Sequence, residues 1–405
     1  VHPGKYIGDI SFNNKNVKLF SKVKETNNLI YRDSTIINGN VAITNIDSSS
    51  MFSGFMVHKG QVKIRNSLLK IKDLHIRDHS TTGLSIGNNS NVKLDNLKIA
   101  NNSSDVAGGG ISIFDSKVDL INSVIDSNST TNEGGGITSG RSYLKIINSK
   151  ITNNFATQHG AGIHSSYDSS LFVFKSTFEN DSSSSNDGGA MFINYPLSSV
   201  KIDQSIFNKN VSSARGGAIT IISGGININN SSFSNNLSAE EGGVLYALLP
   251  INNVLTKDSL IISNSTIKNN KSYKEGTFLY ANLRGGDFFS LTKSTLVSNE
   301  NLNQSNNYRL IRIIENSTSN NFVIDNNTIA NNNIYEIFSL NQRGMKFSNN
   351  IIWHNKWGDD LSYTSFADNS LSGDRFSYNN IEGYQNTEDG NINSDPLFSN
   401  ISEDK

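Results

Sequence analysis

The 405-residue sequence has no cysteine, only 4 prolines and no long uninterrupted apolar segment. Without cysteine the chain cannot form disulfides, thiolate metal sites or a cysteine nucleophile. A transmembrane helix needs about 18 consecutive apolar residues, and no such run is present. Positive and negative charges almost cancel, at a net charge of −1, so no basic stripe suggests a nucleic-acid partner.

Long helical patterns rich in Leu and Ala are also missing, whereas asparagine occurs 61 times. Asn and Ser disfavour helix interiors because their side chains compete for backbone hydrogen bonds. We therefore expect strands and turns almost everywhere. Many Asn-x-Ser/Thr sequons occur, and several of their Asn residues fall at positions that we expect to face inward. This pattern, with the lack of cysteine, favours a bacterial secreted protein.

One template recurs about every 26 residues and reads apolar-x-apolar-x-polar-Ser-x-apolar-x-x-Asn, as in Val118 to Asn128 and Leu144 to Asn154. The alternation predicts strands with one buried face. A four-stranded propeller blade would need about 40 to 45 residues, so the period is too short for it. The repeat predicts an all-β fold: a single-stranded right-handed parallel β-helix, a pectate-lyase-like solenoid of about 13 rungs.

The last position of the template forms a column of asparagines. We expect these side chains to face inward, to tolerate left-handed backbone at a bend, and to hydrogen-bond from rung to rung at about 4.8 Å. A serine column five residues earlier should do the same less strongly. The expected structural ladder consists of Asn102, Asn128, Asn154, Asn210, Asn236, Asn270, Asn299, Asn332 and Asn355, with Asp181 in the same column.

A glycine motif follows each of these asparagines by about six residues, as in Gly134 to Ile137 and Gly216 to Ile219. Glycine provides positive φ angles and close backbone approach where one strand turns into the next. Ionisable residues stand immediately before these glycines. Stacked on successive rungs, they could act as acid, base and charge clamp of a polysaccharide lyase, or form a solvated ladder of alternating charge. The catalytic candidates are Glu133, His159, Asp187 and Arg215.

A second column lies on the outward face of the strand after the glycines. Exposed aromatic side chains on a flat sheet can stack on sugar rings, unless loops fold over them. The ligand-binding candidates are His164, Phe192, Tyr246 and Tyr280. A weak calcium candidate has oxygen ligands at alternating positions, although the glycine and the final glutamate of a calcium loop are missing. Its residues are Asp389, Asn391, Asn393 and Asp395. We expect no other cofactor or metal.

The pairing of Gly-Gly-Ala-Ile at Gly216 to Ile219 with Phe-x-x-Asn at Phe207 to Asn210 resembles the polymorphic outer-membrane protein repeats, although the cysteines of that family are missing. That family consists of surface-exposed adhesins with β-helical passengers. The ends, Val1 to Tyr6 and Gly390 to Phe398, resemble choice-of-anchor-type β-helix proteins of bacterial surfaces. The resemblance implies a β-helix over residues 1–380, a closing segment over 381–405, and a sorting or anchor module after it.

We therefore expect an extracellular or outer-membrane-surface protein of a bacterium that binds or displays without catalysis. Its partner would be a glycan or another surface, within a larger assembly, and not a nucleic acid. Two alternatives stay open: a polysaccharide lyase or glycoside hydrolase, and a structural spacer. Between Asn96 and Gly243 only five to eight residues separate the Asn and Gly motifs, which favours a shallow face over a catalytic cleft.

Overall fold

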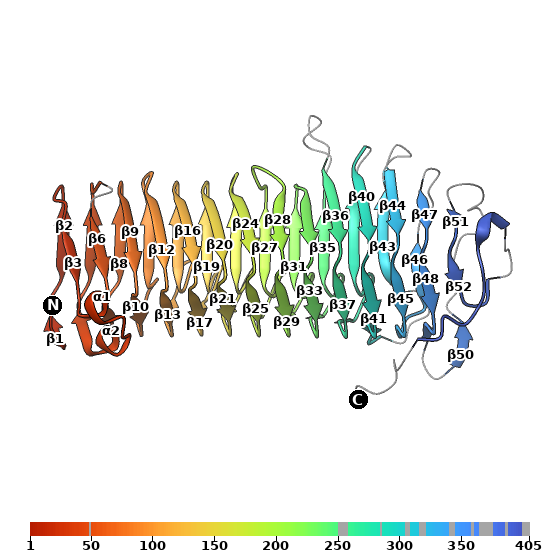
Figure 1. Ribbon diagram of the computed structural model, residues 1–405, viewed down its shortest axis with the longest axis horizontal. Helices are drawn as coiled ribbons and strands as arrows, with labels where there is room; N and C mark the ends of the chain where they lie inside the picture. The colour runs from red at the N-terminus through yellow and green to blue at the C-terminus, as the bar shows by residue number, and fades with distance from the viewer. Residues whose placement is uncertain are drawn as a thin grey trace.

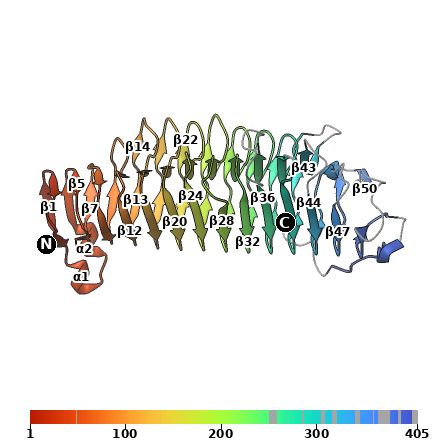
Figure 2. The same cartoon turned by 90° about the horizontal axis from the view of Figure 1, so that it is seen from above.

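The computed structural model describes residues 1–47, 50–249, 258–283, 286–303, 308–315, 321–339, 345–357, 360–363, 376–384 and 388–398. The chain winds into a long rod of stacked coils, with the N-terminus at one end and strands β51 (Phe376–Ser377) and β52 (Asn380–Ile381) near the other (Figures 1 and 2). It is an all-β parallel solenoid of about 12 turns, which confirms the predicted fold class.

One coil in the middle of the rod shows the arrangement that the others repeat. Strand β16 (Lys117–Ile121) is followed by β17 (Val124–Asp126), the short β18 (Ser129–Thr130) and, after the glycine turn, β19 (Ile137–Gly140). The next coil begins with β20 (Tyr143–Ile147), which pairs with β16 in parallel. Each strand lies beside its equivalent one coil away, so a 26-residue sequence repeat becomes a stack.

Four parallel sheets run along the rod in the described part of the chain. Sheet A has 15 strands, from β1 (Gly4–Ile7) to β52, and sheet B has 13, from β2 (Ile10–Asn13) to β46 (Glu336–Ser339). Sheet C has 14 strands, from β3 (Lys18–Phe20) to β51. Sheet D has eight two-residue strands, from β14 (Ser103–Ser104) to β42 (Glu300–Asn301).

The apolar positions of the template fill the space between the sheets. From Ile37 onward, Ile, Leu and Val side chains of successive coils form one continuous buried cluster, and the partly buried Ile10 and Leu19 of the first coil pack against it. Inside it, Phe207 stacks on Phe178 and on Phe233, with 4.8 Å between ring centroids in both pairs. This distance is the spacing of neighbouring parallel strands, so the rings stack because the register puts them at the same place in each coil.

The nine asparagines of the predicted ladder lie inside the rod and are at most 4% exposed. The Asn128 amide shows the pattern: its Nδ2 donates to Asn154 Oδ1 at 3.2 Å and to the Ile99 carbonyl at 3.0 Å. Its backbone N–H also donates to Asn154 Oδ1, at 3.0 Å. Each buried amide therefore satisfies backbone groups at the bend as well as its neighbour in the stack.

The expected left-handed backbone occurs one residue earlier than predicted. Ser127, Asn153 and Asn235, each directly before a ladder asparagine, have φ angles of 54°, 55° and 56°. At each bend the left-handed residue, such as Ser127, faces solvent, and the side chain of the next residue, such as Asn128, points inward. The serine ladder also differs from the expectation. The Ser123 backbone N–H donates to Ser149 Oγ at 3.1 Å, while Ser123 Oγ donates to the Ile121 carbonyl of its own coil at 2.7 Å.

Two short helices interrupt the first coils, where the sequence predicted none. Helix α1 (Val23–Thr26) and helix α2 (Ile30–Ser34) lie beside the first strands of sheet A (Figure 1). Asp33 fixes α2 to the sheet, since its Oδ1 lies 3.0 Å from Nδ1 of the buried His75. None of the described helices has the length and apolar character that crossing a bilayer requires.

Residues 388–398 close the far end of the rod. Asn379 Nδ2 donates to Asn391 Oδ1 at 3.0 Å, and Asn391 Nδ2 donates to the Phe376 carbonyl at 3.0 Å. These asparagines continue the serine ladder: after Ser294 the same position is occupied by Asn327, Asn350 and Asn379. Asn391 is the last described amide of this ladder. Of the expected closing segment, 381–405, residues 385–387 and 399–405 lie outside the described residues.

Candidate functional site

The ionisable residues before the glycines lie in the turns that lead from sheet D to sheet B. Asp187 and Arg215 form a two-pronged ion pair, with Nε to Oδ1 at 3.0 Å and Nη2 to Oδ2 at 2.8 Å. The Asp187 side chain is only 3% exposed. Burial opposes charge on Arg215, but the hydrogen bonds and charge of Asp187 outweigh it and raise the pKa of the guanidinium. The carboxylate of Asp187 is therefore fully engaged within the protein.

The other two catalytic candidates do not complete a reactive cluster with this pair. His159 Nδ1 accepts a hydrogen bond from the Asp187 backbone N–H at 3.4 Å. Burial lowers the pKa of this imidazole, against the charge of Asp187. Glu133 instead faces His164, with Oε2 3.3 Å from Nδ1. A catalytic role for these four residues stays a prediction, and it would require Asp187 to be released from Arg215.

The outward column of sheet B exists, but it is not an open face. His164, Phe192 and Tyr246 are only 5%, 5% and 6% exposed, which agrees with the alternative that loops fold over this face. The turns cover them: the His159 ring lies 4.2 Å from the Phe192 ring, and the Arg215 guanidinium lies 4.6 Å from the Tyr246 ring.

Further contacts tie the same column together. Arg215 Nη1 donates to the Tyr246 hydroxyl at 3.0 Å, and Tyr246 stacks on the half-buried Tyr280 at 5.2 Å. Burial lowers the pKa of His164 to about 3, so this imidazole is neutral at physiological pH. Ligand binding by His164, Phe192, Tyr246 and Tyr280 stays a prediction, and it would need the turns above them to move aside.

The turn glycines explain why the covering lies so close. Gly188 has a φ of 74°, and a Cβ there would lie 2.3 Å from the Met191 carbonyl oxygen and 3.1 Å from Phe192 Cβ. Only glycine fits such an approach without moving the backbone. The prediction of positive φ and close contact at these glycines is confirmed. The close approach of these turns to the strand is also what covers the aromatic column.

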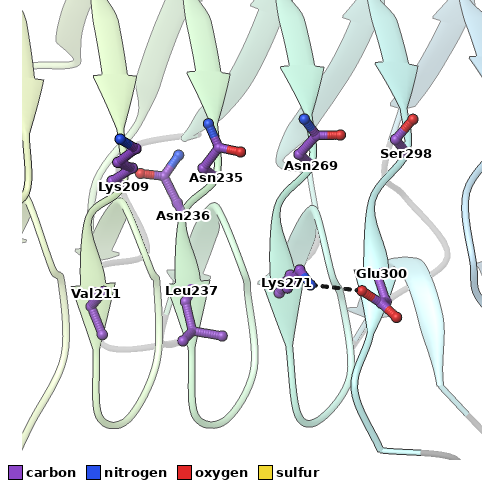
Figure 3. Close-up of a pocket in the computed structure, with 9 residues that line it drawn as sticks. All are labelled: Lys209, Val211, Asn235, Asn236, Leu237, Asn269, Lys271, Ser298 and Glu300. Atoms are coloured by element: carbon purple, nitrogen blue, oxygen red, sulfur yellow. Dashed lines mark ion pairs between the residues drawn. The ribbon is translucent and has the colours of Figure 1, made fainter. Parts of the chain in front are cut away.

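A groove of about 450 Å³ follows the bend between sheets A and D, and the sequence reasoning did not identify it. Figure 3 shows two rows of side chains along it, one on the bend and one on the short strands below. In the lower row Lys271 forms an ion pair with Glu300 at 2.9 Å. No aromatic ring lines this groove. The residues are Lys209, Val211, Asn235, Asn236, Leu237, Asn269, Lys271, Ser298 and Glu300.

A different surface gathers exposed aromatic and basic side chains, on the outward face of sheet C and the turns that enter it from sheet B. The strands are β15 (Ile111–Phe114), β16, β20 and β24 (Ser170–Phe174). We name it the aromatic–basic patch. It consists of Phe114, Lys117, Arg141, Tyr143, Lys145, Tyr167, Phe172, Phe174 and Lys175.

The strand register places these side chains next to one another. Lys117 pairs across the strands with Tyr143, and Lys145 pairs with Phe172. Phe114, Tyr143 and Tyr167 are 40%, 38% and 64% exposed. Since a parallel sheet holds its strands about 4.8 Å apart, the rings are presented on a flat and rigid base. Exposed aromatic groups clustered on neighbouring strands indicate a contact surface more than isolated apolar residues would.

Gly140 creates a notch in this patch. It lies on β19 beside Phe114, and a Cβ at Gly140 would meet the Phe114 ring at 2.7 Å and the Tyr167 ring at 3.7 Å. The guanidinium of Arg141 lies over the Phe114 ring, 4.0 Å from its centroid. Arg141 is also held by Asp115, with Nε to Oδ1 at 2.7 Å and Nη2 to Oδ2 at 3.0 Å. The ring of Phe114 is therefore fixed in place.

The calcium candidates are used mainly to shape the end of the rod. Asn391 serves in the buried ladder, Asn393 Oδ1 accepts the Gly383 N–H at 3.1 Å, and Asp395 Oδ1 accepts the Leu397 N–H at 2.8 Å. Within the described ranges, no group of three or more His, Asp or Glu side chains has the arrangement of a metal site. Calcium binding by Asp389, Asn391, Asn393 and Asp395 stays a prediction.

Comparison with known proteins adds no relative. No protein-family model, no curated protein and no solved structure matches the chain significantly.

Proposed function

We propose that this solenoid is a non-catalytic binding protein, secreted or exposed at a bacterial surface, and that it binds glycans through the aromatic–basic patch. The observation that carries the proposal is the set of exposed rings on three consecutive coils, with Phe114, Tyr143 and Tyr167 each more than a third exposed. Aromatic rings bind the apolar faces of sugars, and exposed rings have a hydration cost that a binding function would justify.

The arrangement around Asp187 and Arg215 favours binding over the alternative of a lyase or hydrolase. A general base needs a carboxylate or imidazole within reach of a substrate proton. Asp187 is buried and paired with Arg215, and the turns hold their glycines against the strand below. The resemblance of the repeats to surface adhesins supports the location, and an adhesin or anchored surface protein is the form of display that we propose.

The test is a binding screen of the purified chain on an array of neutral and acidic polysaccharides. The wild type is compared with a Tyr143→Ala/Tyr167→Ala double variant and with Tyr273→Ala, which removes an exposed ring outside the patch. We expect binding that the double variant loses by at least tenfold and that the control retains. Binding that survives the double variant, or no binding to any glycan, contradicts the proposal. Release of unsaturated products, followed by ultraviolet absorbance, would favour the lyase.

A further inference from the structure

We propose, on the basis of the proposed function, that the ligand of the aromatic–basic patch is an acidic polysaccharide whose negative groups pair with the patch lysines. The chain would lie across β16, β20 and β24, with sugar faces on the rings and carboxylates or sulfates beside the ammonium groups. The juxtaposition of rings with lysines, coil after coil, is the observation behind this inference.

Three lysines of the patch each lie near an aromatic ring. The ammonium nitrogen is 5.5 Å from the Tyr143 centroid for Lys117, 5.5 Å from the Phe172 centroid for Lys145, and 5.2 Å from the Phe174 centroid for Lys175. Contacts of this type are weak at an exposed site but hold the cation beside the ring. A sugar that stacks on one of these rings would bring its substituents within reach of a positive charge.

These lysines are available for an external anion. In the described part of the chain, neither Lys117, Lys145 nor Lys175 takes part in an ion pair. Arg141 is different, because Asp115 neutralises it with two hydrogen bonds. Arginine thus orients Phe114, whereas the lysines provide the free charge.

The patch is positive on a chain that is slightly negative. Lys117, Arg141, Lys145 and Lys175 contribute four positive charges, and Asp115, Asp119 and Asp168 in the same segments contribute three negative charges, which leaves a local charge of +1. The whole chain has a net charge of −1. A local excess of this sign attracts anionic ligands and makes the attraction sensitive to salt.

The number of free charges favours an acidic glycan over a single-stranded nucleic acid. Nucleic-acid sites track the backbone with an extended positive groove and contact several phosphates. Here three unpaired lysines are spread among rings, and Asp119 stands directly opposite Lys145 on the neighbouring strand. A chain with moderate charge density, whose sugars also stack, fits this spacing better.

The test compares acidic polysaccharides with their carboxyl-reduced forms. Polygalacturonate, alginate and hyaluronan are titrated, each beside its reduced neutral counterpart and beside a thymidine oligonucleotide. The variants are Lys117→Gln/Lys145→Gln/Lys175→Gln and a matched control, Lys150→Gln/Lys209→Gln/Lys293→Gln, which removes three exposed lysines outside the patch. We expect an acidic polymer to bind more tightly than its reduced form. The patch variant should lose about tenfold in affinity, the effect of about three exposed ion pairs, and much of the salt dependence. The control should keep both.

The outcomes separate this inference from the proposed function. Equal affinity for acidic and reduced polymers, with no effect of the lysine variant, overturns the acidic ligand but leaves glycan binding by the rings. No binding to any polysaccharide overturns both. Tight binding of the oligonucleotide, lost in the lysine variant, overturns the inference in favour of a nucleic acid. Circular dichroism of each variant checks that the solenoid is intact.

Discussion

Replacing Asp181 with asparagine should remove a pH dependence of stability that one carboxyl group imposes on the solenoid. Asp181 occupies a position of the buried asparagine ladder and is 0% exposed. Its Oδ1 accepts hydrogen bonds from the backbone N–H and Nδ2 of Asn154, at 2.8 Å and 3.0 Å. Its Oδ2 is buried with no hydrogen-bond partner among the described residues. An ionised carboxylate there would leave a buried charge without a counterion.

Burial, against the hydrogen bonds from Asn154, holds the pKa of the Asp181 carboxyl well above its ordinary value of 3.8. The stabilising contribution of the neutral acid is therefore complete below about pH 3.8 and is lost as the pH rises through the folded-state pKa. Across that window the folded state binds more protons than the unfolded state. The free energy of unfolding then falls by about 1.4 kcal/mol per pH unit from this group.

The new amide has no proton to lose, and it can donate where the carboxylate cannot. Elsewhere in the ladder the amide nitrogen donates to the next Asn and to a carbonyl, as Asn210 does to Asn236 and Phe178 at 3.0 Å and 3.1 Å. Each such hydrogen bond is worth about 1 kcal/mol net. Asp181→Asn should therefore stabilise the protein increasingly above pH 4.

Urea unfolding followed by far-ultraviolet circular dichroism, in steps from pH 4 to pH 8, measures this effect. The free energy of wild type minus that of the variant should become more negative with a slope of about 1.4 kcal/mol per pH unit until the folded-state pKa is reached. Asp168→Asn, in an exposed turn outside the ladder, is the matched control for the change from aspartate to asparagine. Parallel curves for wild type and Asp181→Asn would show that Asp181 is not held as a neutral acid.

Three further substitutions test other parts of the structure, each by urea midpoint. Asn236→Ala removes the hydrogen bonds of this amide with Asn210, Phe207 and Asn270, and should lower the free energy of unfolding by about 3 kcal/mol. The outward Asn227→Ala should lower it by under about 0.5 kcal/mol. Equal losses would contradict a structural ladder. Gly135→Ala puts a Cβ 2.2 Å from the Phe155 carbonyl oxygen, which is part of the backbone ladder. It should destabilise more than Gly140→Ala, whose Cβ meets only side-chain atoms, the nearest in the partly exposed Phe114 at 2.7 Å; the reverse order would refute the packing argument. Asp187→Asn weakens a largely buried ion pair and should cost about 3 kcal/mol without changing glycan binding; lost binding by a folded variant would return this residue to the candidate site.

Most of the fold follows from the sequence because the inward positions must repeat. A ladder amide such as Asn128 bonds to its equivalent in the next coil, so the same residue recurs and the register can be read directly. The left-handed residue before it has no such requirement. Asparagine is frequent at that position, but Ser127, Lys209 and His354 also occupy it, so the column is less regular than the ladder although the backbone is the same. Helices α1 and α2 were missed because they belong to an insertion between coils, outside the template.

The candidate site was harder to predict, for two physical reasons. The position of Phe192 and Tyr246 on the outward face of sheet B follows from alternation, but their burial depends on how the turn above them folds. Glycines allow many turn conformations, so the sequence pattern alone does not determine whether the turn covers these aromatic side chains. The patch was missed because Lys145 and Phe172 fall at an unspecified position of the template and Tyr143 lies just before the template begins. Aligning those positions coil by coil would have paired Lys145 with Phe172, as the strands do.

The unspecified positions are also where a solenoid can acquire function without losing its fold. At the position of Lys145 and Phe172, neighbouring coils carry Lys93, Asp119, Lys201 and Asn227, all on the outward side of the same sheet. Because so many side chains are accepted there, stability does not require a ring at this place. Exposed aromatic groups favour unwanted association, so their concentration on three coils needs a reason other than folding, and contact with a ligand provides one. By the same reasoning, the ring and lysine variants of the patch should fold as well as the wild type, which makes any loss of binding a direct measure of that contact.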